Sequence, residues 1–206
     1  MIDTFKLFNY DKSILNDKIK IIAGMDEVGR GPLAGPVVTS CVVMPYDEMI
    51  DGVFDSKRLT AKKREELCEK IKAKALSYAI TLEDKNTIDN INILQATKKS
   101  MENSFKTLKL KPDLLLVDAV KNLNIDCATN SIIKGDATSY AIACASILAK
   151  VYRDKLMEEY AKIYPEYDFE NNKGYGTKKH IEALKKFGAT PIHRKSFISH
   201  FTSIDK

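Results

Sequence analysis

The sequence predicts an α/β fold in which a mixed central β-sheet is flanked by helices. Short β-branched and apolar segments, residues 21–25 and 37–44, occur early in the chain and are typical of strands. Residues 114–117 form an uninterrupted apolar run that ends in Asp118, as expected for a strand buried on both faces. The chain opens with strands and closes with helices, and together with a buried central strand this arrangement favours the α/β class with a mixed sheet.

The remaining elements follow from local patterns along the chain. Residues 60–75 place Leu67 and Ile71 on one face behind a possible Thr60 N-cap, which predicts a helix. Apolar residues alternate over 78–82, as in a strand, and recur at helical spacing over 94–108. The last predicted elements are a short strand at 131–134, a long Ala-rich helix without Gly or Pro at 137–160, and a helix at 177–187.

The length and composition predict one domain over residues 1–206. A chain of 206 residues with 44% hydrophobic residues can bury one sizeable core and is short for two. Residues 1–19 are expected to be an N-terminal extension, and residues 173–206 a small helical C-terminal segment that binds substrate. The net charge of +5 permits a polyanionic partner without requiring one.

The sequence predicts a cytoplasmic monomer without a membrane partner. The N-terminus lacks the apolar core of a signal peptide, and the longest apolar stretch, residues 141–149, is too short to cross a bilayer. The four cysteines are scattered, which indicates reduced thiols in a cytoplasm. None of the three histidines lies in an H-E-x-x-H motif, so a zinc hydrolase is not expected.

Acidic residues follow the predicted buried strands. Asp26 and Glu27 come directly after the first strand, Asp118 ends the strand at 114–117, and Asp136 is expected to open the long helix. Ligands bind at this edge of α/β sheets. Carboxylates without His or Cys favour Mg²⁺ or Mn²⁺, and such clusters suit phosphodiester hydrolysis.

Each acid also has a purely structural interpretation. Asp118 alone could cap a turn, and Asp136 alone could be an N-cap. The adjacent pair Asp26 and Glu27 is harder to explain in this way, because two buried carboxylates without a partner lose solvation energy. Neighbouring residues on a regular strand point to opposite faces, so this pair can share a metal only if the strand bends or ends there.

A glycine-rich loop follows the acidic pair. Residues 29–34 fit the G-x-G-x-x-A dinucleotide pattern, but that pattern must open a helix, and here Pro36 and Val37 open a strand. The preceding acids would also repel a pyrophosphate, so a dinucleotide-dependent oxidoreductase is disfavoured. The loop is either an ordinary turn or a place where the backbone approaches a ligand closely, as glycine permits.

These motifs together resemble the ribonuclease HII family. DEVGRGPLAGPVV from Asp26 is similar to the signature of that family. Further blocks follow in the same order, from about Ile21 to Phe197, so the resemblance covers nearly the whole chain. They are DSK from Asp55, VDAV around Asp118, KGDATSYAIACASILAKVYRD from Lys134, KGYGTKKH from Lys173 and TPIHRKSF from Thr190.

The resemblance implies a ribonuclease H-like fold and an endonuclease activity on RNA–DNA hybrids. The expected partners are such hybrids and duplex DNA that contains ribonucleotides. Cleavage would occur 5′ to the ribonucleotide and leave 3′-hydroxyl and 5′-phosphate ends, with Mn²⁺ or Mg²⁺ as cofactor. The metal-binding catalytic acids implied by the resemblance are Asp26, Glu27, Asp118 and Asp136.

The resemblance also implies substrate-binding residues. The loop Gly29, Arg30 and Gly31 corresponds to the reader of the ribose 2′-hydroxyl, and Tyr175 to a tyrosine that packs on the sugar beside the scissile bond. Lys57 is expected near a substrate phosphate. Residues 173–195 contain seven Lys or Arg and one acid among interleaved aromatics, which suits either a nucleic-acid backbone or a solvated helix face.

Two related alternatives remain. A protein that binds hybrids without cutting them would gain from losing negative charge near phosphate, so the presence of all four acids opposes it. Ribonuclease HIII has a long additional N-terminal domain and a different glycine loop. This chain has about twenty residues before the first strand, which favours the HII family.

Overall fold

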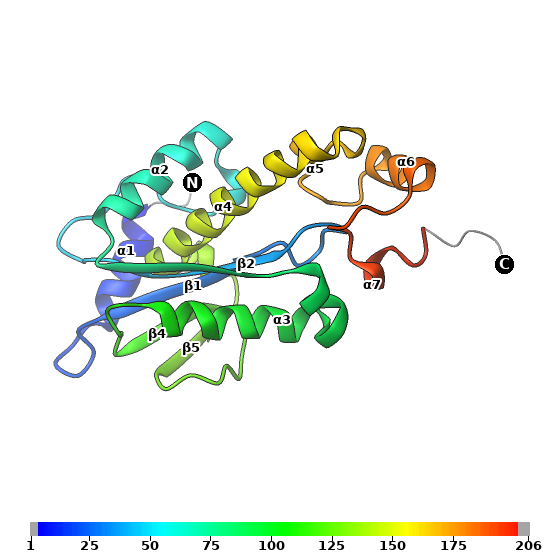
Figure 1. Cartoon of the computed structure of the whole chain (residues 1–206). Helices are drawn as coiled ribbons and strands as arrows, with labels where there is room; N and C mark the ends of the chain where they lie inside the picture. The colour runs from blue at the N-terminus through cyan, green and yellow to red at the C-terminus, as the bar shows by residue number, and fades with distance from the viewer. Residues whose placement is uncertain (1–3, 202–206) are drawn as a thin grey trace.

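The computed structural model describes residues 4–201 and contains a five-stranded mixed sheet in the order β3-β2-β1-β4-β5 (Figure 1). Strand β1 pairs antiparallel with β2 and parallel with β4, β2 pairs antiparallel with β3, and β4 pairs parallel with β5. The predicted α/β class with a mixed sheet is therefore confirmed. The strands are β1 (Ile22–Val28), β2 (Val37–Val43), β3 (Ser77–Glu83), β4 (Leu114–Asp118) and β5 (Ala128–Ile132).

Helices cover both faces of the sheet (Figure 1). On one face α3 packs through Met101 and Phe105 on β1 and β4, while on the other α4 packs through Ile142 on Ile22. The helices are α1 (Thr4–Ile14), α2 (Ala61–Lys74), α3 (Lys85–Thr107), α4 (Tyr140–Ile163), α5 (Phe169–Asn172), α6 (Lys178–Phe187) and α7 (Lys195–Ile198). Three 3₁₀ turns are η1 (Ser56–Arg58), η2 (Gly135–Ala137) and η3 (Pro165–Tyr167).

Side-chain caps mark the starts of two predicted helices, and the cap at Thr60 was itself predicted. The hydroxyl of Thr60 accepts a hydrogen bond from the Lys63 N–H at 3.2 Å, and α2 begins at the next residue. In the same way Thr177 accepts from the His180 N–H at 3.3 Å at the start of α6. Side-chain oxygens satisfy backbone donors that an α-helix leaves unpaired at its N-terminus.

Three predicted elements are placed differently. The long helix begins at Tyr140 behind the cap Ser139, and Asp136 lies in the separate turn η2, so the prediction that Asp136 opens the helix was wrong. The preceding Lys134 has φ 56°, and this left-handed residue starts a tight turn instead of a helix. The strand predicted at 131–134 instead runs from Ala128 to Ile132. It is an exposed edge strand, so its sequence lacks the apolar alternation that would have located its start. Helix α3 extends from Lys85 with an interruption at Asn92.

The segment expected to be only an N-terminal extension forms α1, which is part of the core. Leu7 and Phe8 are buried against α4. The fully buried carboxylate of Asp11 accepts from the Ala141 N–H at 2.8 Å and from the Tyr46 hydroxyl at 2.9 Å. Burial raises the pKa of Asp11 to about 6. Helix α1 thus satisfies a backbone donor in the first turn of α4, beside the turn that contains Asp136.

The C-terminal segment packs beyond the end of the sheet (Figure 1). Its apolar residues form a cluster with Leu33 and Ala34, at the end of the glycine-rich loop 29–34, and with Met157 of α4. The segment therefore lies against the loop that the sequence analysis marked for substrate recognition. Within residues 4–201, no helix is long and apolar enough to cross a membrane.

Candidate active site

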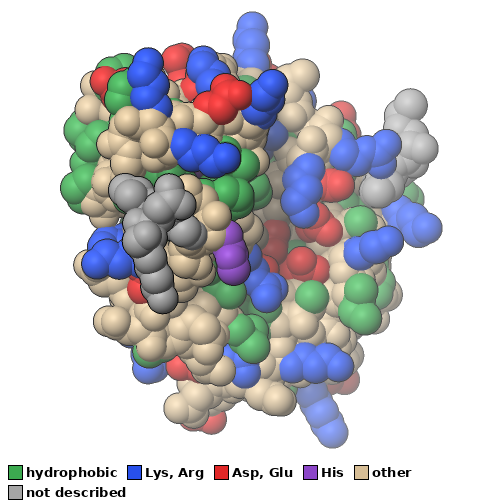
Figure 2. Space-filling model, turned by 90° about the vertical axis from the view of Figure 1, so that its right-hand side faces the viewer, with side chains coloured by type: hydrophobic (Ala, Val, Ile, Leu, Met, Phe, Trp, Pro, Cys, Tyr) green, Lys and Arg blue, Asp and Glu red, His purple; other side chains and the backbone are tan. Residues whose placement is uncertain are grey.

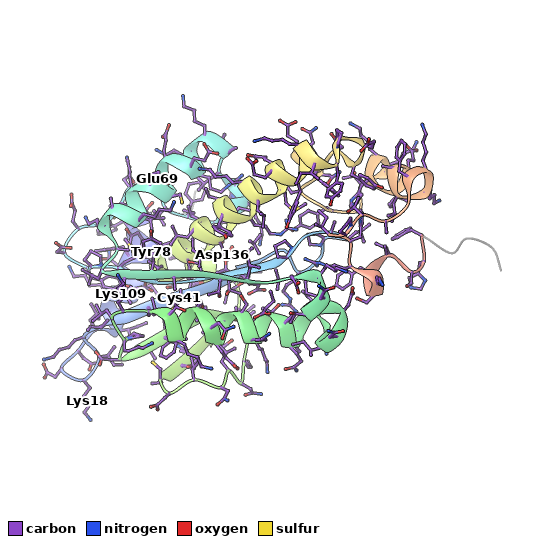
Figure 3. All side chains as sticks on the ribbon, viewed as in Figure 1. Lys18, Cys41, Glu69, Tyr78, Lys109 and Asp136 are labelled. Carbon is purple, nitrogen blue, oxygen red and sulfur yellow. The ribbon has the colours of Figure 1, made fainter. Side chains whose placement is uncertain are left out.

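Asp26 and Asp118 lie side by side where the parallel pairing of β1 with β4 ends. Met25 of β1 pairs with Val117 of β4, so Asp26 and Asp118 come next on adjacent strands. The Oδ1 atom of Asp118 accepts from the Gly135 N–H at 2.6 Å, which joins the end of β4 to η2. The next residue in that turn is Asp136. The fold thus brings together three acids that are far apart in the sequence, and Figure 3 shows Asp136 where α4 approaches the sheet.

Strand β1 does not end at the acidic pair. Strand β1 continues to Val28, and Asp26 lies opposite Ser40 while Glu27 lies opposite Thr39. Asp26 faces α4, where Ser146 hydrogen-bonds to it, and strand alternation directs Glu27 toward the other face. The charges of Asp118 and Lys57 nevertheless act on Glu27, so its carboxylate remains part of the acidic cluster. Among residues 4–201, no group of three or more His, Cys, Asp or Glu side chains is placed to hold a metal ion in this conformation.

The acids nevertheless form one electrostatic unit. Burial raises the pKa of Asp26 well above its ordinary value, and the charges of Glu27 and Asp118 raise it further. Burial also raises the pKa of Glu27, with Arg30 opposing and Asp118 adding to the shift. The pKa of Asp136 is raised by burial and by Asp118, with Lys57 opposing. Buried carboxylates that repel one another are stabilised by a nearby cation.

One buried oxygen at the site has no partner. Glu27 Oε1 accepts weakly from Arg30 Nη1 at 3.4 Å, whereas Glu27 Oε2 is buried without a hydrogen bond. An unsatisfied buried carboxylate oxygen is costly in a folded protein. The donor set, which consists of carboxylate oxygens alone, fits Mg²⁺ or Mn²⁺. The residues present therefore fit a divalent cation in their chemistry, although their side chains must move to surround one.

Lys57 lies beside these acids, on η1. The Asp55 side chain accepts from the Lys57 N–H at 2.9 Å and sets the turn. Partial burial lowers the pKa of Lys57, but the charges of Asp136 and Asp26, together with other acids, outweigh this and the net shift is upward. A cation that stays protonated at the edge of the acidic cluster can contact a phosphate.

The two glycines of the loop differ in what the fold demands of them. Gly29 is buried at φ +93°, and a Cβ there would lie 2.3 Å from Arg153 Nε, so the packing itself requires glycine. Gly31 is exposed, and a Cβ there would meet only Tyr175 Cε1, at an ordinary 3.7 Å. Gly31 and Tyr175, a residue that is 43% exposed, are therefore neighbours, although 144 positions separate them in the numbering (175 − 31).

Two buried arginines that the sequence analysis did not single out hold this loop. Arg194 donates to the carbonyls of Gly29 at 2.6 Å, Arg30 at 3.0 Å and Gly35 at 2.9 Å. Since a peptide N–H points opposite to the carbonyl of the same planar unit, the N–H groups that follow Gly29 and Arg30 point away from Arg194. Nothing in the spacing of Arg194 distinguished it from a surface cation.

Arg153 of α4 likewise donates hydrogen bonds to backbone carbonyls around this loop. It donates to the carbonyls of Ala34 at 3.1 Å, Pro36 at 3.0 Å and Lys173 at 2.8 Å. Burial lowers the pKa of Arg153 to about 10 and that of Arg194 to about 9. Within the described part of the chain, neither guanidinium forms an ion pair, so their direct hydrogen-bond partners are backbone carbonyls.

The surface around the acids suits a polyanion. Viewed from the end of the molecule where the C-terminal segment lies, acidic side chains occupy a hollow, and Lys and Arg side chains surround it (Figure 2). Lys178 and Lys179 of α6 belong to the exposed basic residues of this segment. The surrounding Lys and Arg side chains can attract a phosphodiester backbone. The acidic side chains in the hollow would repel it unless bound cations neutralise them.

Comparison with known proteins agrees with this arrangement. The family model described as Ribonuclease HII matches residues 23–200. A ribonuclease HII of Lactobacillus gasseri is 53% identical over 190 residues, which cover 92% of this chain and 75% of that protein. A ribonuclease HII of Clostridioides difficile is 52% identical over 199 residues, which cover 97% of this chain and 76% of that protein.

Solved structures show the same fold. The ribonuclease H2 of Pyrococcus horikoshii superposes with a TM-score of 0.75 at 27% identity, covering 89% of this chain and 99% of that one. Bst-RNase HIII in complex with Mn²⁺ superposes with a TM-score of 0.63 at 16% identity, covering 81% of this chain and 61% of that one. The chain belongs to the ribonuclease HII family, which confirms the prediction that it is a ribonuclease H.

Proposed function

We propose that this enzyme cuts the RNA strand of RNA–DNA hybrids and cleaves 5′ to single ribonucleotides in duplex DNA. Asp26, Glu27, Asp118 and Asp136 are its metal-binding catalytic acids. The observation that supports this most directly is the pairing of Met25 with Val117, which sets Asp26 beside Asp118, together with the bond from Gly135 to Asp118. These contacts concentrate negative charge at one point, in a hollow that Lys and Arg side chains surround.

The four acids would hold Mg²⁺ or Mn²⁺ after a rearrangement of their side chains. When bound, such ions activate a water molecule and stabilise the charge that develops on the phosphate. The protein prepares this chemistry by keeping Asp26 and Asp136 buried and close to Asp118, so that a cation is more strongly attracted than it would be in water. The Mn²⁺ in the Bst-RNase HIII structure supports a divalent ion.

The glycine loop and Tyr175 form the reader of the ribose. With the carbonyls of Gly29 and Arg30 bound to Arg194, the N–H groups of Arg30 and Gly31 are free to face a substrate. A 2′-hydroxyl can accept from such a donor, and it distinguishes RNA from DNA. The exposed Tyr175 ring beside Gly31 packs on the sugar, and Lys57 contacts a phosphate near the acids.

The test is cleavage of an end-labelled DNA duplex that contains one ribonucleotide, in Mg²⁺, in Mn²⁺ and in chelator. We expect one cut 5′ to the ribonucleotide, with 3′-hydroxyl and 5′-phosphate ends, in at least one metal and no cut in chelator. An all-DNA duplex of the same sequence is the control. Tight binding without any cut in either metal would favour the alternative of a non-cleaving hybrid-binding protein. The cytoplasmic location and the monomeric state stay predictions.

A further inference from the structure

Two buried histidines lie behind Tyr175 and are not used by the proposed chemistry. His180 of α6 is fully buried, and His193 is 2% exposed. Their Nε2 atoms are 2.9 Å apart. Both rings are enclosed by Tyr167 and Phe169, with the Phe169 and His180 centroids 5.2 Å apart in an edge-on arrangement. Polar ring atoms in such apolar surroundings need defined hydrogen-bond partners.

The partners at the two ends of this pair determine where each proton lies. The Thr190 backbone N–H donates to His193 Nδ1 at 2.9 Å, so that nitrogen is an acceptor and the proton of neutral His193 is on Nε2. His193 Nε2–H therefore donates to His180 Nε2, and the proton of His180 is on Nδ1. His180 Nδ1–H then donates to the Tyr175 carbonyl at 2.8 Å. The donors therefore all point the same way, from Thr190 through His193 and His180 to the Tyr175 carbonyl, and every ring nitrogen has a hydrogen-bond partner.

The same short segment also determines the position of the glycine loop. His193 forms a β-bridge with Ala34, and the next residue, Arg194, holds the carbonyls of Gly29 and Arg30. The Leu33 N–H donates to the Gly174 carbonyl at 2.8 Å, which joins the loop to the residue before Tyr175. The backbone of Tyr175 and the loop beside it are therefore fixed relative to each other by contacts that include His193.

We propose that His180 and His193 are positioning residues, whose directed hydrogen-bond chain holds Tyr175 beside Gly31 so that the ring packs on the substrate sugar. This proposal rests on the proposed function for the role of Tyr175 and adds two residues to it. Neither histidine touches the substrate. Their effect reaches the reaction through the Tyr175 carbonyl, because a displaced backbone moves the ring that the sugar contacts.

The first test is the tautomer of each ring, measured by long-range ¹H–¹⁵N NMR at about pH 7.5. We expect His180 to carry its proton on Nδ1 and His193 on Nε2, with the exposed His200 as a reference signal in the same spectrum. This result does not depend on activity. Reversed tautomers in the two buried rings, or a charged ring in either, would overturn the directed chain.

The second test compares two substitutions that differ in which ring nitrogen they replace. The amide of His180→Asn reaches the position of Nδ1 and can still donate to the Tyr175 carbonyl, whereas that of His180→Gln reaches the position of Nε2 and cannot. On the single-ribonucleotide duplex we expect kcat/KM to fall about 3- to 10-fold in His180→Gln, the loss of one hydrogen bond. His180→Asn should recover most of this, and His200→Gln is the control.

A double-mutant cycle separates positioning from general destabilisation. In the Tyr175→Ala background, His180→Gln should lower kcat/KM by less than about 2-fold, because its effect runs through the missing ring. If His180→Gln lowered kcat/KM by the same factor in the wild-type and Tyr175→Ala backgrounds, the proposal would be refuted. If the tautomers are as expected but Tyr175→Ala cuts like the wild type, the role of Tyr175 in the proposed function is wrong and the positioning role falls with it. Thermal unfolding of each variant reports the structural effect separately.

Discussion

Alanine substitutions at Gly29 and Gly31 provide a matched pair that separates folding from recognition. At Gly29 the new Cβ would lie 2.3 Å from Arg153 Nε and 2.8 Å from the Pro36 carbonyl oxygen, at φ +93°. The left-handed backbone costs alanine about 1–2 kcal/mol. Moving a fully buried arginine that holds three carbonyls adds a similar amount at least. We expect Gly29→Ala to lose roughly 3 kcal/mol of unfolding free energy, or about 6–12 °C in Tm for a chain of this size.

Gly31→Ala should behave in the opposite way. Its Cβ has only the ordinary 3.7 Å contact with Tyr175 Cε1, so Tm should change by no more than about 1–2 °C. A ribose that approaches the loop within hydrogen-bond distance, roughly 3 Å, would meet that Cβ. We therefore expect cleavage at a single ribonucleotide to fall on the order of 10- to 100-fold, the loss of about 1.4–2.8 kcal/mol of transition-state stabilisation.

The assay combines thermal unfolding with kcat/KM on a duplex with one ribonucleotide and on one with a complete RNA strand. Metal affinity, measured by calorimetry, should be the same for Gly31→Ala and the wild type. If Gly31→Ala cuts both substrates as fast as the wild type, the loop is only a turn and the ribose is read elsewhere. If Gly31→Ala instead unfolds as easily as Gly29→Ala, the distinction drawn from the packing is wrong.

The other predictions concern the acids, the basic helix and a buried histidine. Asp26→Asn and Asp118→Asn should each keep the fold, judged by circular dichroism, and lose nearly all Mg²⁺-dependent cleavage, because an amide cannot replace a charged ligand; near wild-type turnover in either would show that the metal site was misassigned. Replacing Lys178 and Lys179, both exposed, by Gln should weaken binding to all duplexes alike and reduce the slope of log K against log salt; an unchanged slope would make α6 an ordinary solvated face. Burial lowers the pKa of His193 from 6.5 to about 4, so the folded protein resists a proton that the unfolded chain accepts. The neutral His193 therefore contributes on the order of 3 kcal/mol to the free energy of unfolding above pH 6.5, and this contribution is lost as the pH falls toward 4. Urea unfolding over this range should show that loss, with a flatter profile for His193→Gln, and equal profiles would contradict it.

The class of fold and the positions of most strands were predictable because they depend on short-range patterns. The apolar run 114–117 is confirmed as β4, the Thr60 cap is confirmed at α2, and the helix predicted at 177–187 is confirmed as α6. Each of these signals acts between residues that are at most four positions apart. Helix α1 was missed for the opposite reason. Its stability comes from burying Leu7 and Phe8 against α4, a contact that local sequence does not reveal.

The sequence by itself determined the chemistry available to this protein. Its motifs identified four acids, a glycine loop and a tyrosine, and the family they predicted is confirmed. They did not distinguish the roles of the two glycines, because Gly29 and Gly31 differ in backbone conformation and in what packs against them. Nor could they predict the turn at Asp136, which depends on the left-handed Lys134.

Only the tertiary structure decided how these groups are held. Arg153, Arg194, His180 and His193 are buried polar side chains, and their hydrogen bonds reach backbone groups up to 165 positions away. A buried cation or imidazole must find such partners, because burial removes it from bulk solvent. Which carbonyl it reaches depends on the packing of β1, α4 and the C-terminal segment together. The residues that would perform the reaction can thus be read from motifs, whereas the residues that position them follow from long-range contacts.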